Sequence, residues 1–349
     1  MKYTYSILAL GFMASCMSRQ PEYAVLQPTY VTDSVNYDSD DPAIWINRKD
    51  PQNSLILGTD KQELDGGLYA FDLKGNMLKD RKGYPLDRPN NVDIVYDVVV
   101  NGDTTDIAVA TERGKGQIRV FSLPELQPID NGGIKVFEDD SLNNKVMGVA
   151  LYKRPSDNKV FAIVSRKEGT ANVDKYLYQY ELVSDSLGLK GNLVRKFGQF
   201  SNSKEIEAVA VDAELGYVYY SDEHFGVRKY YADPEKGDEE LAQFALDGFT
   251  DDREGISIYK TGAGTGYLIV SDQGANQFQV FPREGTVENP HQHDLIATIR
   301  VTAMSSDGSE STSIALGPEY PKGLFVAMSD NKTFEIYDWR EFEKHIINR

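Results

Sequence analysis

The sequence predicts an all-β fold, a six-bladed β-propeller, and three observations support this prediction. A unit of two short strands joined by a tight turn recurs along the 349-residue chain with a period of roughly 50 to 60 residues, which is typical of propellers and solenoids. Each unit continues with a third strand in which aromatic residues alternate with polar ones, as in a half-buried sheet. The fixed period favours radial closure, which leaves few free sheet edges, over an open two-sheet sandwich.

The clearest unit is a hairpin from Glu205 to Glu223, in which two runs rich in Val and Tyr flank a break at 214–216. In an antiparallel hairpin the start of the first strand lies beside the end of the second, so Glu207 and Glu223 are expected to meet. Two carboxylates held together repel each other unless a proton or a cation lies between them. A single pair of this kind is usually just two solvated strand-end acids, so the repetition of the pattern is what favours a shared site.

The expected strands follow the same order in every unit. First strands are expected at 40–45, 91–96, 146–152, 205–213, 252–259 and 312–316, and second strands at 55–61, 106–113, 161–169, 217–223, 267–272 and 324–330. Third strands are expected at 67–73, 117–121, 176–180, 227–231, 277–281 and 333–337, and fourth strands at 133–137, 193–200, 241–249 and 296–301. The sixth unit shows no fourth strand, since a short charged tail follows Trp339. The extended segment 23–35 could supply that strand and close the ring.

The chain begins with a stretch typical of an export signal. Lys2 gives a positive start, 7–13 is an apolar run too short to span a bilayer, and small residues precede Cys16. This leader resembles a bacterial lipoprotein signal, in which the peptide before the cysteine is removed and Cys16 is lipidated; an ordinary secretory peptide is the alternative. We therefore expect residues 1–16 to be the signal with its lipidated cysteine, 17–32 a tether and 33–349 the propeller. The mature protein is expected to be exported and anchored in the periplasm, the outer membrane or the cell surface.

Composition limits the possible partners. The formal net charge of −17 and the pI near 4.7 mean that an unaided surface repels nucleic acid and anionic membranes. We expect no nucleic-acid partner, membrane contact through the lipid anchor only, and a monomer. Cys16 is the only cysteine, which excludes a disulfide framework and zinc sites built from cysteines. The four histidines are too scattered for a histidine-rich metal site.

Charged residues recur at two positions of each unit, the start of the first strand and the end of the second. In a propeller the first strands line the central channel, so these positions crowd around one mouth. Unit by unit they are Asp40 and Asp41 with Lys61, Asp93 with Arg113, Met147 with Lys167 and Glu168, Glu207 with Asp222 and Glu223, Asp252 and Glu254 with Asp272, and Asp307 or Glu310 with Asp330. The first three units bring cations and the last three almost only acids. One half of the mouth is thus expected to accept anions and the other half cations.

The acids of this ring indicate a hard cation. Clustered carboxylates with few His or Cys select Ca²⁺, which accepts six to eight oxygens in flexible geometry, over Mg²⁺, which demands a stricter octahedron. Lys and Arg suit phosphate, and Arg can contact it with two hydrogen bonds. We expect the site to bind a polyanion bridged by several Ca²⁺ ions. Hydrolysis of a phosphate ester through a phosphohistidine would need an Arg-His-Gly motif, and hydrolysis through a phosphocysteine would need a cysteine beyond the leader; the sequence has neither. It also has no Gly-x-Ser-x-Gly elbow for a nucleophilic serine. Attack by a metal-activated water remains.

Short motifs follow one another from Asp40 to about Asp338. They are Asp-Asp-Pro-Ala-Ile-Trp at 40–45, Asn-Asn-Val-Asp at 90–93, Asp-Ile-Ala-Val-Ala at 106–110 before Arg113, Lys-Glu-Gly at 167–169, Glu207, Glu223, Arg-Glu-Gly at 253–255, Ser-Asp-Gln-Gly at 271–274 and Leu-Gly-Pro-Glu-Tyr-Pro at 316–321. Each motif alone is weak. In this order and spacing the chain resembles the β-propeller phytases, calcium-dependent phosphatases of phytate (myo-inositol hexakisphosphate).

This resemblance implies roles for individual residues. The residues that resemble phosphate-binding groups are Lys61, Arg113, Lys167 and Glu168. The residues that resemble calcium ligands or their supports are Asp41, Asp93, Glu207, Glu223, Asp252, Glu254 and Asp307. The implied catalytic set is Lys61, Arg113, Lys167, Glu168, Glu207 and Glu223. The implied activity is that of a 3-phytase-like phosphoric monoester hydrolase that needs calcium to release inorganic phosphate. Its pH optimum should be neutral to alkaline, since carboxylates must be ionised to hold the metal.

Three departures from the family pattern leave alternatives open. Met147 stands where the family has a phosphate-contacting Tyr, Gln62 stands where a second lysine is common, and the acidic loop 305–311 is short. One alternative is a non-catalytic lipoprotein that captures phosphorylated ligands. The other is a propeller lactonase with one calcium ion in its channel, against which the basic trio of Lys61, Arg113 and Lys167 argues.

Overall fold

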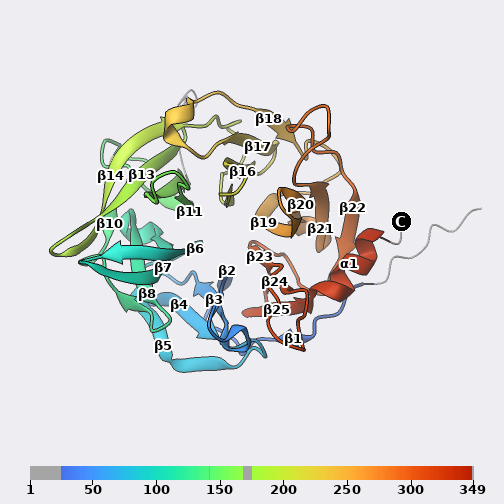
Figure 1. Ribbon diagram of the computed structural model, residues 1–349, viewed down its shortest axis with the longest axis horizontal. Helices are drawn as coiled ribbons and strands as arrows, with labels where there is room; N and C mark the ends of the chain where they lie inside the picture. The colour runs from blue at the N-terminus through green and yellow to red at the C-terminus, as the bar shows by residue number, and fades with distance from the viewer. Residues whose placement is uncertain (1–24, 141, 168–174, 348–349) are drawn as a thin grey trace, which may run out of the picture.

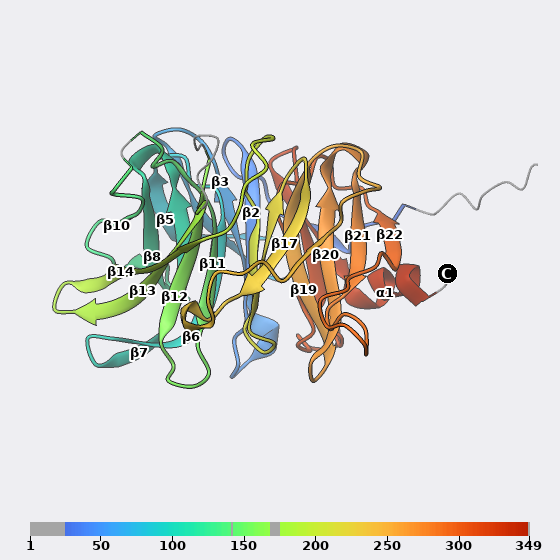
Figure 2. The same cartoon turned by 90° about the horizontal axis from the view of Figure 1, so that it is seen from above.

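Six antiparallel sheets stand as blades around one central axis (Figure 1). A view at right angles shows the strands running along that axis (Figure 2). The computed structural model describes residues 25–140, 142–167 and 175–347. The prediction of an all-β, six-bladed β-propeller is therefore confirmed.

Each blade has four strands in consecutive antiparallel order, and β9 adds a short fifth strand to blade two. Blades one and two consist of β2 (Ser39–Trp45), β3 (Leu55–Asp60), β4 (Gly66–Phe71) and β5 (Met77–Leu86), and of β6 (Val92–Val100), β7 (Asp103–Glu112), β8 (Gln117–Leu123), β9 (Gln127–Pro128) and β10 (Ile134–Lys135). Blades three and four consist of β11 (Val146–Lys153), β12 (Val160–Arg166), β13 (Leu177–Asp185) and β14 (Gly188–Phe197), and of β15 (Val209–Asp212), β16 (Tyr217–Asp222), β17 (Gly226–Tyr231) and β18 (Ala242–Phe244). Blades five and six consist of β19 (Arg253–Gly262), β20 (Thr265–Asp272), β21 (Gln277–Pro282) and β22 (Ala297–Arg300), and of β23 (Ser309–Thr312), β24 (Leu324–Ser329), β25 (Thr333–Asp338) and β1 (Tyr30–Val31).

The last blade joins the two ends of the described chain. Its fourth strand is β1, which pairs antiparallel with β25, so that Tyr30 lies opposite Ile336 and Val31 opposite Glu335. β1 belongs to the segment 23–35. This pairing completes blade six with an N-terminal strand, so that both ends of the described chain contribute to the blade that closes the ring.

The first strands of the blades form the inner ring, and each contacts the first strands of both neighbouring blades. These strands are β2, β6, β11, β15, β19 and β23.

The hairpin of β6 and β7 is longer than the sequence predicted. Its turn is Asn101-Gly102, and both residues have positive φ, 53° and 90°. This is the type I′ geometry that favours Asn-Gly and matches the twist of the strands.

Apolar clusters between neighbouring blades form the core. In the contact between blades one and six, a Cβ atom built on Gly58 would lie 2.2 Å from the ring of Phe334. Glycine in the middle of β3 therefore allows the Phe334 ring to pack directly against the backbone of blade one. We infer that a side chain at position 58 would push the two blades apart.

The segment after β25 differs from the expected charged tail, because it forms the helix α1 (Trp339–Ile347). Trp339 and Phe342 are fully buried, and Ile346 packs against the same cluster. The spacing of these three residues places them on one helical face. That face packs on Tyr259 and Phe325, so tertiary burial gives the charged segment its helical form. Within the described part of the chain, no helix is long and apolar enough to cross a lipid bilayer.

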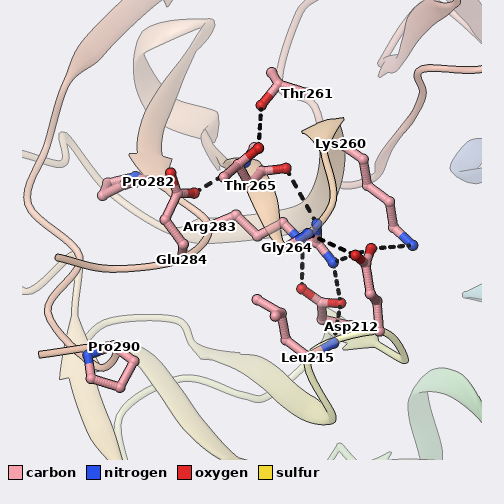
Figure 3. A network of polar contacts seen from close by, with 12 residues as sticks. Asp212, Leu215, Lys260, Thr261, Gly264, Thr265, Pro282, Arg283, Glu284 and Pro290 are labelled. Atoms are coloured by element: carbon pink, nitrogen blue, oxygen red, sulfur yellow. Dashed lines mark hydrogen bonds and ion pairs between the residues drawn. The ribbon is translucent and has the colours of Figure 1, made fainter. Parts of the chain in front are cut away.

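A buried arginine, Arg283, ties blades four and five together through Asp212, the last residue of β15, at the end away from the starts of the first strands. Its contacts are drawn in Figure 3. The guanidinium of Arg283 donates from Nε and Nη2 to the two carboxylate oxygens of Asp212, at 2.5 and 2.7 Å. Nη2 also donates to Glu214 Oε2 at 2.9 Å. The side chains of Arg283 and Asp212 are both fully buried. This buried ion pair connects the two blades. Removing one partner would leave the other charged and desolvated, which would strongly destabilise the contact between them.

A second buried polar pair, His293 and Lys229, lies on the same pair of blades. Lys229 Nζ lies 3.1 Å from His293 Nε2, and His293 Nδ1 lies 2.7 Å from the carbonyl oxygen of Pro282. With Nδ1 donating to that carbonyl, Nε2 is left to accept from the ammonium. Burial, together with the ammonium of Lys229, lowers the pKa of His293 to about 4. His293 is therefore neutral in the folded protein near neutral pH.

We expect this pair to make the fold sensitive to acid. An unfolded histidine titrates near pH 6.5, so between about pH 6.5 and about pH 4 the unfolded chain binds one proton more than the folded chain. The His293 contribution to stability is thus lost as the pH falls, by up to about 3 kcal/mol. Urea unfolding at about pH 7 and about pH 4.5 should show a smaller loss in His293→Gln than in the unaltered protein. Burial also lowers the pKa of the half-buried neighbour His291, so His291→Gln should reduce the loss by less, and an equal effect of the two substitutions would contradict this assignment.

Candidate active site

The starts of the first strands and the ends of the second strands meet at one mouth of the channel, as the hairpin geometry requires. Six acids gather there from blades one, four, five and six. They are Asp40, Glu207, Glu223, Asp252, Glu254 and Asp307, and all are buried except Asp307, which is half-buried. Acids so close together and so poorly solvated need positive charge between them.

Lys61 provides part of that charge where blades one and six meet. Its Nζ atom lies 2.8 Å from Asp40 Oδ1 and 2.5 Å from Asp307 Oδ2. Burial disfavours the ionised form of Asp40, but Lys61 outweighs it and keeps the pKa of that carboxyl below its usual value. Burial and the charge of Asp40 raise the pKa of Asp307 to about 7. Lys61 is thus a half-buried ammonium bridging two acids at the edge of the cluster.

Asn90 links blade two to this group. Its Nδ2 donates to Asp40 Oδ2 at 3.0 Å and to Glu207 Oε1 at 3.5 Å. Burial, followed by the charges of Asp40 and Asp307, raises the pKa of Glu207 well above its usual value. The Oδ1 atom of Asn90 is buried without a hydrogen-bond partner. Neutral Asn90 therefore orients two acids without removing the excess of negative charge.

The strongest candidate for a metal centre is the triad of Glu223, Asp252 and Glu254. Each of the three offers a carboxylate oxygen, and these atoms lie within 4.8 Å of one another. Neither oxygen of Glu223 accepts a hydrogen bond, and the same holds for Oε2 of Glu254, although these atoms are buried. Burial and neighbouring carboxylates raise the pKa of Glu223 to about 8 and that of Glu254 well above its usual value. Buried, unpartnered carboxylate oxygens in this number are the donor set that a hard cation prefers, so the residues fit a metal ion of the Ca²⁺ type.

Two more acidic groups share residues with this triad. Glu205 and Glu207 form one with Glu223, and His224 and Asp251 form another with Asp252. Shared carboxylates allow adjacent cations to be bridged, which is compatible with more than one metal ion at the mouth.

Two basic side chains, Lys204 and His224, contact the carboxylates of the triad from its solvent side. Lys204 Nζ lies 2.5 Å from Asp252 Oδ2 and 3.7 Å from Glu223 Oε2. His224 Nε2 lies 2.7 Å from Asp252 Oδ1, and its Nδ1 lies 3.2 Å from the hydroxyl of Ser203. Both carboxylate oxygens of Asp252 therefore have a basic partner.

The anion-accepting half of the mouth is made by blades one to three. Lys167 forms an ion pair with Glu205, and the guanidinium of Arg113 contacts the thioether of Met147. Arg113 is buried, and its Nε has no hydrogen-bond partner. Met147 is buried against it and offers only a weak acceptor, so the positive charge of Arg113 is left available to an anion. Glu168 lies outside the described residues, as does Cys16 of the leader.

A basic pocket of ≈ 500 Å³ adjoins this half. Its wall includes Arg88, Arg113, Lys115, Lys145 and Lys167. Three of these five side chains have acidic partners: Arg88 pairs with Glu63 at 2.6 Å, Lys115 with Glu112 at 2.8 Å, and Lys167 with Glu205. A pocket with such an excess of cations suits a ligand that carries several phosphates.

Two predicted metal ligands lie deeper than the mouth. Asp41 and Asp93 line a channel cavity of ≈ 160 Å³ together with Glu310. Asp41 Oδ2 accepts from the backbone amide of Val92 at 3.0 Å, and Asp93 Oδ2 accepts from that of Leu151 at 2.6 Å. Burial raises the pKa of Asp93 to about 6 and that of Glu310 to about 8. Asp93 is therefore placed inside the channel rather than beside Arg113 at the mouth.

Two acids assigned to the ring have a structural role instead. Asp222 accepts from the amide of Ser201 at 2.8 Å and pairs with Arg228 at 2.9 Å. Asp272 accepts from the amide of Thr250 at 2.9 Å and from the side chain of Gln277 at 2.7 Å. The corresponding last residues of the second strands in blades one and two, Asp60 and Glu112, also accept backbone amides of the preceding loop. These acids fix loops, whereas Glu223, the first residue after β16, faces the triad.

The structure adds four residues that the sequence did not single out as site residues. They are Asn90, Lys204, Glu205 and His224. The alternation of Glu205 with Glu207 could have indicated the first acid, since residues two apart on an extended strand share a side. Lys204 and His224 lie in loops, where no periodic pattern specifies direction. Lys204 also has a positive φ of 70°, which redirects its side chain.

Comparisons with known proteins agree with this geometry. The family model described as Phytase matches residues 6–341 of the chain. A curated relative, 3-phytase of Bacillus subtilis (strain 168), is 31% identical over 328 residues, which cover 88% of this chain and 81% of the relative. The family match extends over all six blades and hence over every residue of the mouth.

Proposed function

The chain belongs to the phytase family, and from this premise we propose that it releases phosphate from phytate with the help of calcium ions held by the acidic half of the mouth. The observation that carries the calcium requirement is the triad of Glu223, Asp252 and Glu254, whose buried oxygens include three without a hydrogen-bond partner. The enzyme is a hydrolase of phosphoric monoesters.

The basic half of the mouth would hold the substrate. Arg113 can donate two parallel hydrogen bonds to one phosphate, while Lys61 and Lys167 can place single charges against its other oxygens. Further phosphates of the same inositol ring would enter the adjoining pocket of ≈ 500 Å³. The substrate is thereby oriented with one phosphate between the lysines and the acids of blades four to six.

The acidic half of the mouth would hold the calcium ions needed for attack by water. Glu207, Glu223, Asp252, Glu254 and Asp307 would hold calcium, which would supply positive charge against the phosphate and lower the pKa of an attacking water. The water oxygen would form a new bond to phosphorus and give up a proton, the phosphorus–oxygen bond to the inositol would break, and the inositol oxygen would take up that proton through solvent. Lys61 and Lys167 stabilise the negative charge on the phosphoryl oxygens as this exchange proceeds. No covalent intermediate with the protein is required.

Phosphate release from phytate at about pH 7.5 tests this proposal, since carboxylates must be ionised to hold calcium. We expect release with calcium and its loss when chelator is added in excess. Activity that survives exhaustive chelation would contradict the calcium requirement. Calcium-dependent binding of phytate without any release would instead favour a lipoprotein that captures phosphorylated ligands, and lactone hydrolysis without phosphate release would favour the lactonase.

We also infer that the enzyme is exported and anchored through lipidated Cys16, as a monomer. The support for export lies in the leader itself, with Lys2, the apolar run 7–13 and the small residues before Cys16. An anchor at the N-terminus suits the propeller, because β1 places the start of the described chain on the outer edge of blade six, away from the channel (Figure 1). The mouth would remain open to substrate.

A further inference from the structure

Lys204 occupies an unusual place among the lysines of the mouth. Lys61 and Lys167 belong to the anion-accepting half, whereas Lys204 lies in the loop before β15 and contacts the acid triad itself. Its Nζ lies 2.5 Å from Asp252 Oδ2 and 3.7 Å from Glu223 Oε2. The Lys204 side chain is 41% exposed, while those of Asp252 and Glu223 are 6% and 0% exposed. The ammonium thus covers two buried carboxylates from the solvent side.

The ammonium and a metal ion would compete for the same oxygens. A calcium ion lies about 2.4 Å from each carboxylate oxygen that binds it, which is close to the separation of Lys204 Nζ from Asp252 Oδ2. A divalent ion held by Asp252 and Glu223 would therefore lie within a few ångströms of the ammonium, and two cations repel strongly at that distance. The other oxygen of Asp252 already faces His224 Nε2 at 2.7 Å. Full use of Asp252 and Glu223 by a metal thus requires the lysine to leave.

Lys204 is able to leave without disturbing the fold. Its side chain is partly in solvent, and its chain of four methylene groups can turn outwards while the loop backbone stays in place. The two acids cannot follow, because they are buried in the mouth.

We propose that Lys204 is an intramolecular counter-ion, whose ammonium holds a cation position of the acid triad until a divalent ion displaces it. The proposal rests on the calcium site of the proposed function and adds that this site is never without a cation. Lys204 stabilises the metal-free mouth and weakens the apparent affinity for calcium. It acts on the metal through Glu223 and Asp252, so it is a positioning residue and not a catalytic one.

Titration calorimetry of the purified full chain with calcium chloride tests this competition. In Lys204→Gln the metal no longer displaces an ion pair, so we expect calcium to bind about threefold to tenfold more tightly, as for the loss of a partly exposed pair. Lys204→Arg keeps a cation and should resemble the unaltered protein. Lys190→Gln is the matched control, because it also removes one positive charge and one ion pair, with Asp185 at 3.3 Å, on the outer strands of blade three.

Thermal unfolding gives a second readout that a merely structural lysine would not produce. We expect Lys204→Gln to unfold at a lower temperature than the unaltered protein in chelator, since the acids lose their counter-ion, and at the same or a higher temperature in saturating calcium. A similar loss in both conditions would overturn the proposal.

Calcium affinity that is unchanged or weaker in Lys204→Gln would also overturn the proposal, while calcium-dependent phosphate release would leave the proposed function standing. If the unaltered protein binds no calcium, both the counter-ion and the calcium requirement are wrong. The two failures are therefore distinguishable.

Discussion

Replacement of Lys167 by methionine is expected to lower the turnover of phytate by a factor of about 10² to 10³, the usual cost of removing one group that stabilises developing charge. Lys167 directly follows β12, the second strand of blade three, and lies at the wall of the basic pocket with Arg113. Methionine retains most of the length and apolar surface of the side chain but no charge. Phosphate release under saturating phytate and calcium measures the effect.

The control for this prediction is Lys175→Met, which removes an exposed lysine paired with Asp238 at 3.5 Å. It should leave turnover within a factor of about two, because surface ion pairs contribute little. Equal activity of Lys167→Met and Lys175→Met would contradict the placement of substrate against blades one to three.

Lys167 and Lys61 have different surroundings in the structure, although the sequence predicted the same phosphate-binding role for both. Lys61 neutralises Asp40, whose side chain is fully buried, whereas Lys167 pairs with Glu205, which keeps partial contact with solvent. Removing Lys61 would leave a buried carboxylate without a partner, so Lys61→Met should reduce stability as well as turnover. Loss of Lys167 should therefore affect turnover more than folding, whereas loss of Lys61 should affect both.

The fold could be predicted from sequence because its signal is periodic. The hairpin of β15 and β16 shows the reason: its Val and Tyr residues alternate, its break at 214–216 marks the turn, and five similar hairpins follow the same plan. The same alternation places Glu207 and Glu223 at one end. Helix α1 was missed because only three apolar residues, Trp339, Phe342 and Ile346, specify its buried face.

The candidate site was only partly predictable, because its details depend on loops and on single-residue register. Asp222 and Glu223 are neighbours of the same type, yet one fixes a loop and the other faces the triad. Lys204 and His224 reach Asp252 from separate loops, and their meeting is a result of the three-dimensional closure of blades four and five. A pattern in sequence shows which acids share a strand but not which cation covers them.

The second large effect is expected at Glu254, where calcium affinity and stability should change in opposite directions. Glu254 is 4% exposed, its Oε2 has no hydrogen-bond partner, and burial together with Glu207 raises its pKa well above the usual value. A carboxyl with a raised pKa in the folded state destabilises the fold once the pH exceeds its ordinary range. Glu254→Gln has nearly the same shape without the charge, so in chelator at about pH 8 its free energy of unfolding should rise.

In calcium the same substitution should be harmful. Removing one of three close carboxylates should weaken calcium binding by at least about tenfold, and phosphate release at limiting calcium should fall in proportion. Calorimetry and urea unfolding, each with and without calcium, measure the two effects. Glu341→Gln, which removes an exposed acid paired with Lys344 at 2.7 Å on α1, should alter neither. A stabilised, metal-free Glu254→Gln that still bound calcium normally would mean that the repulsion among these acids is real but that another cluster holds the metal.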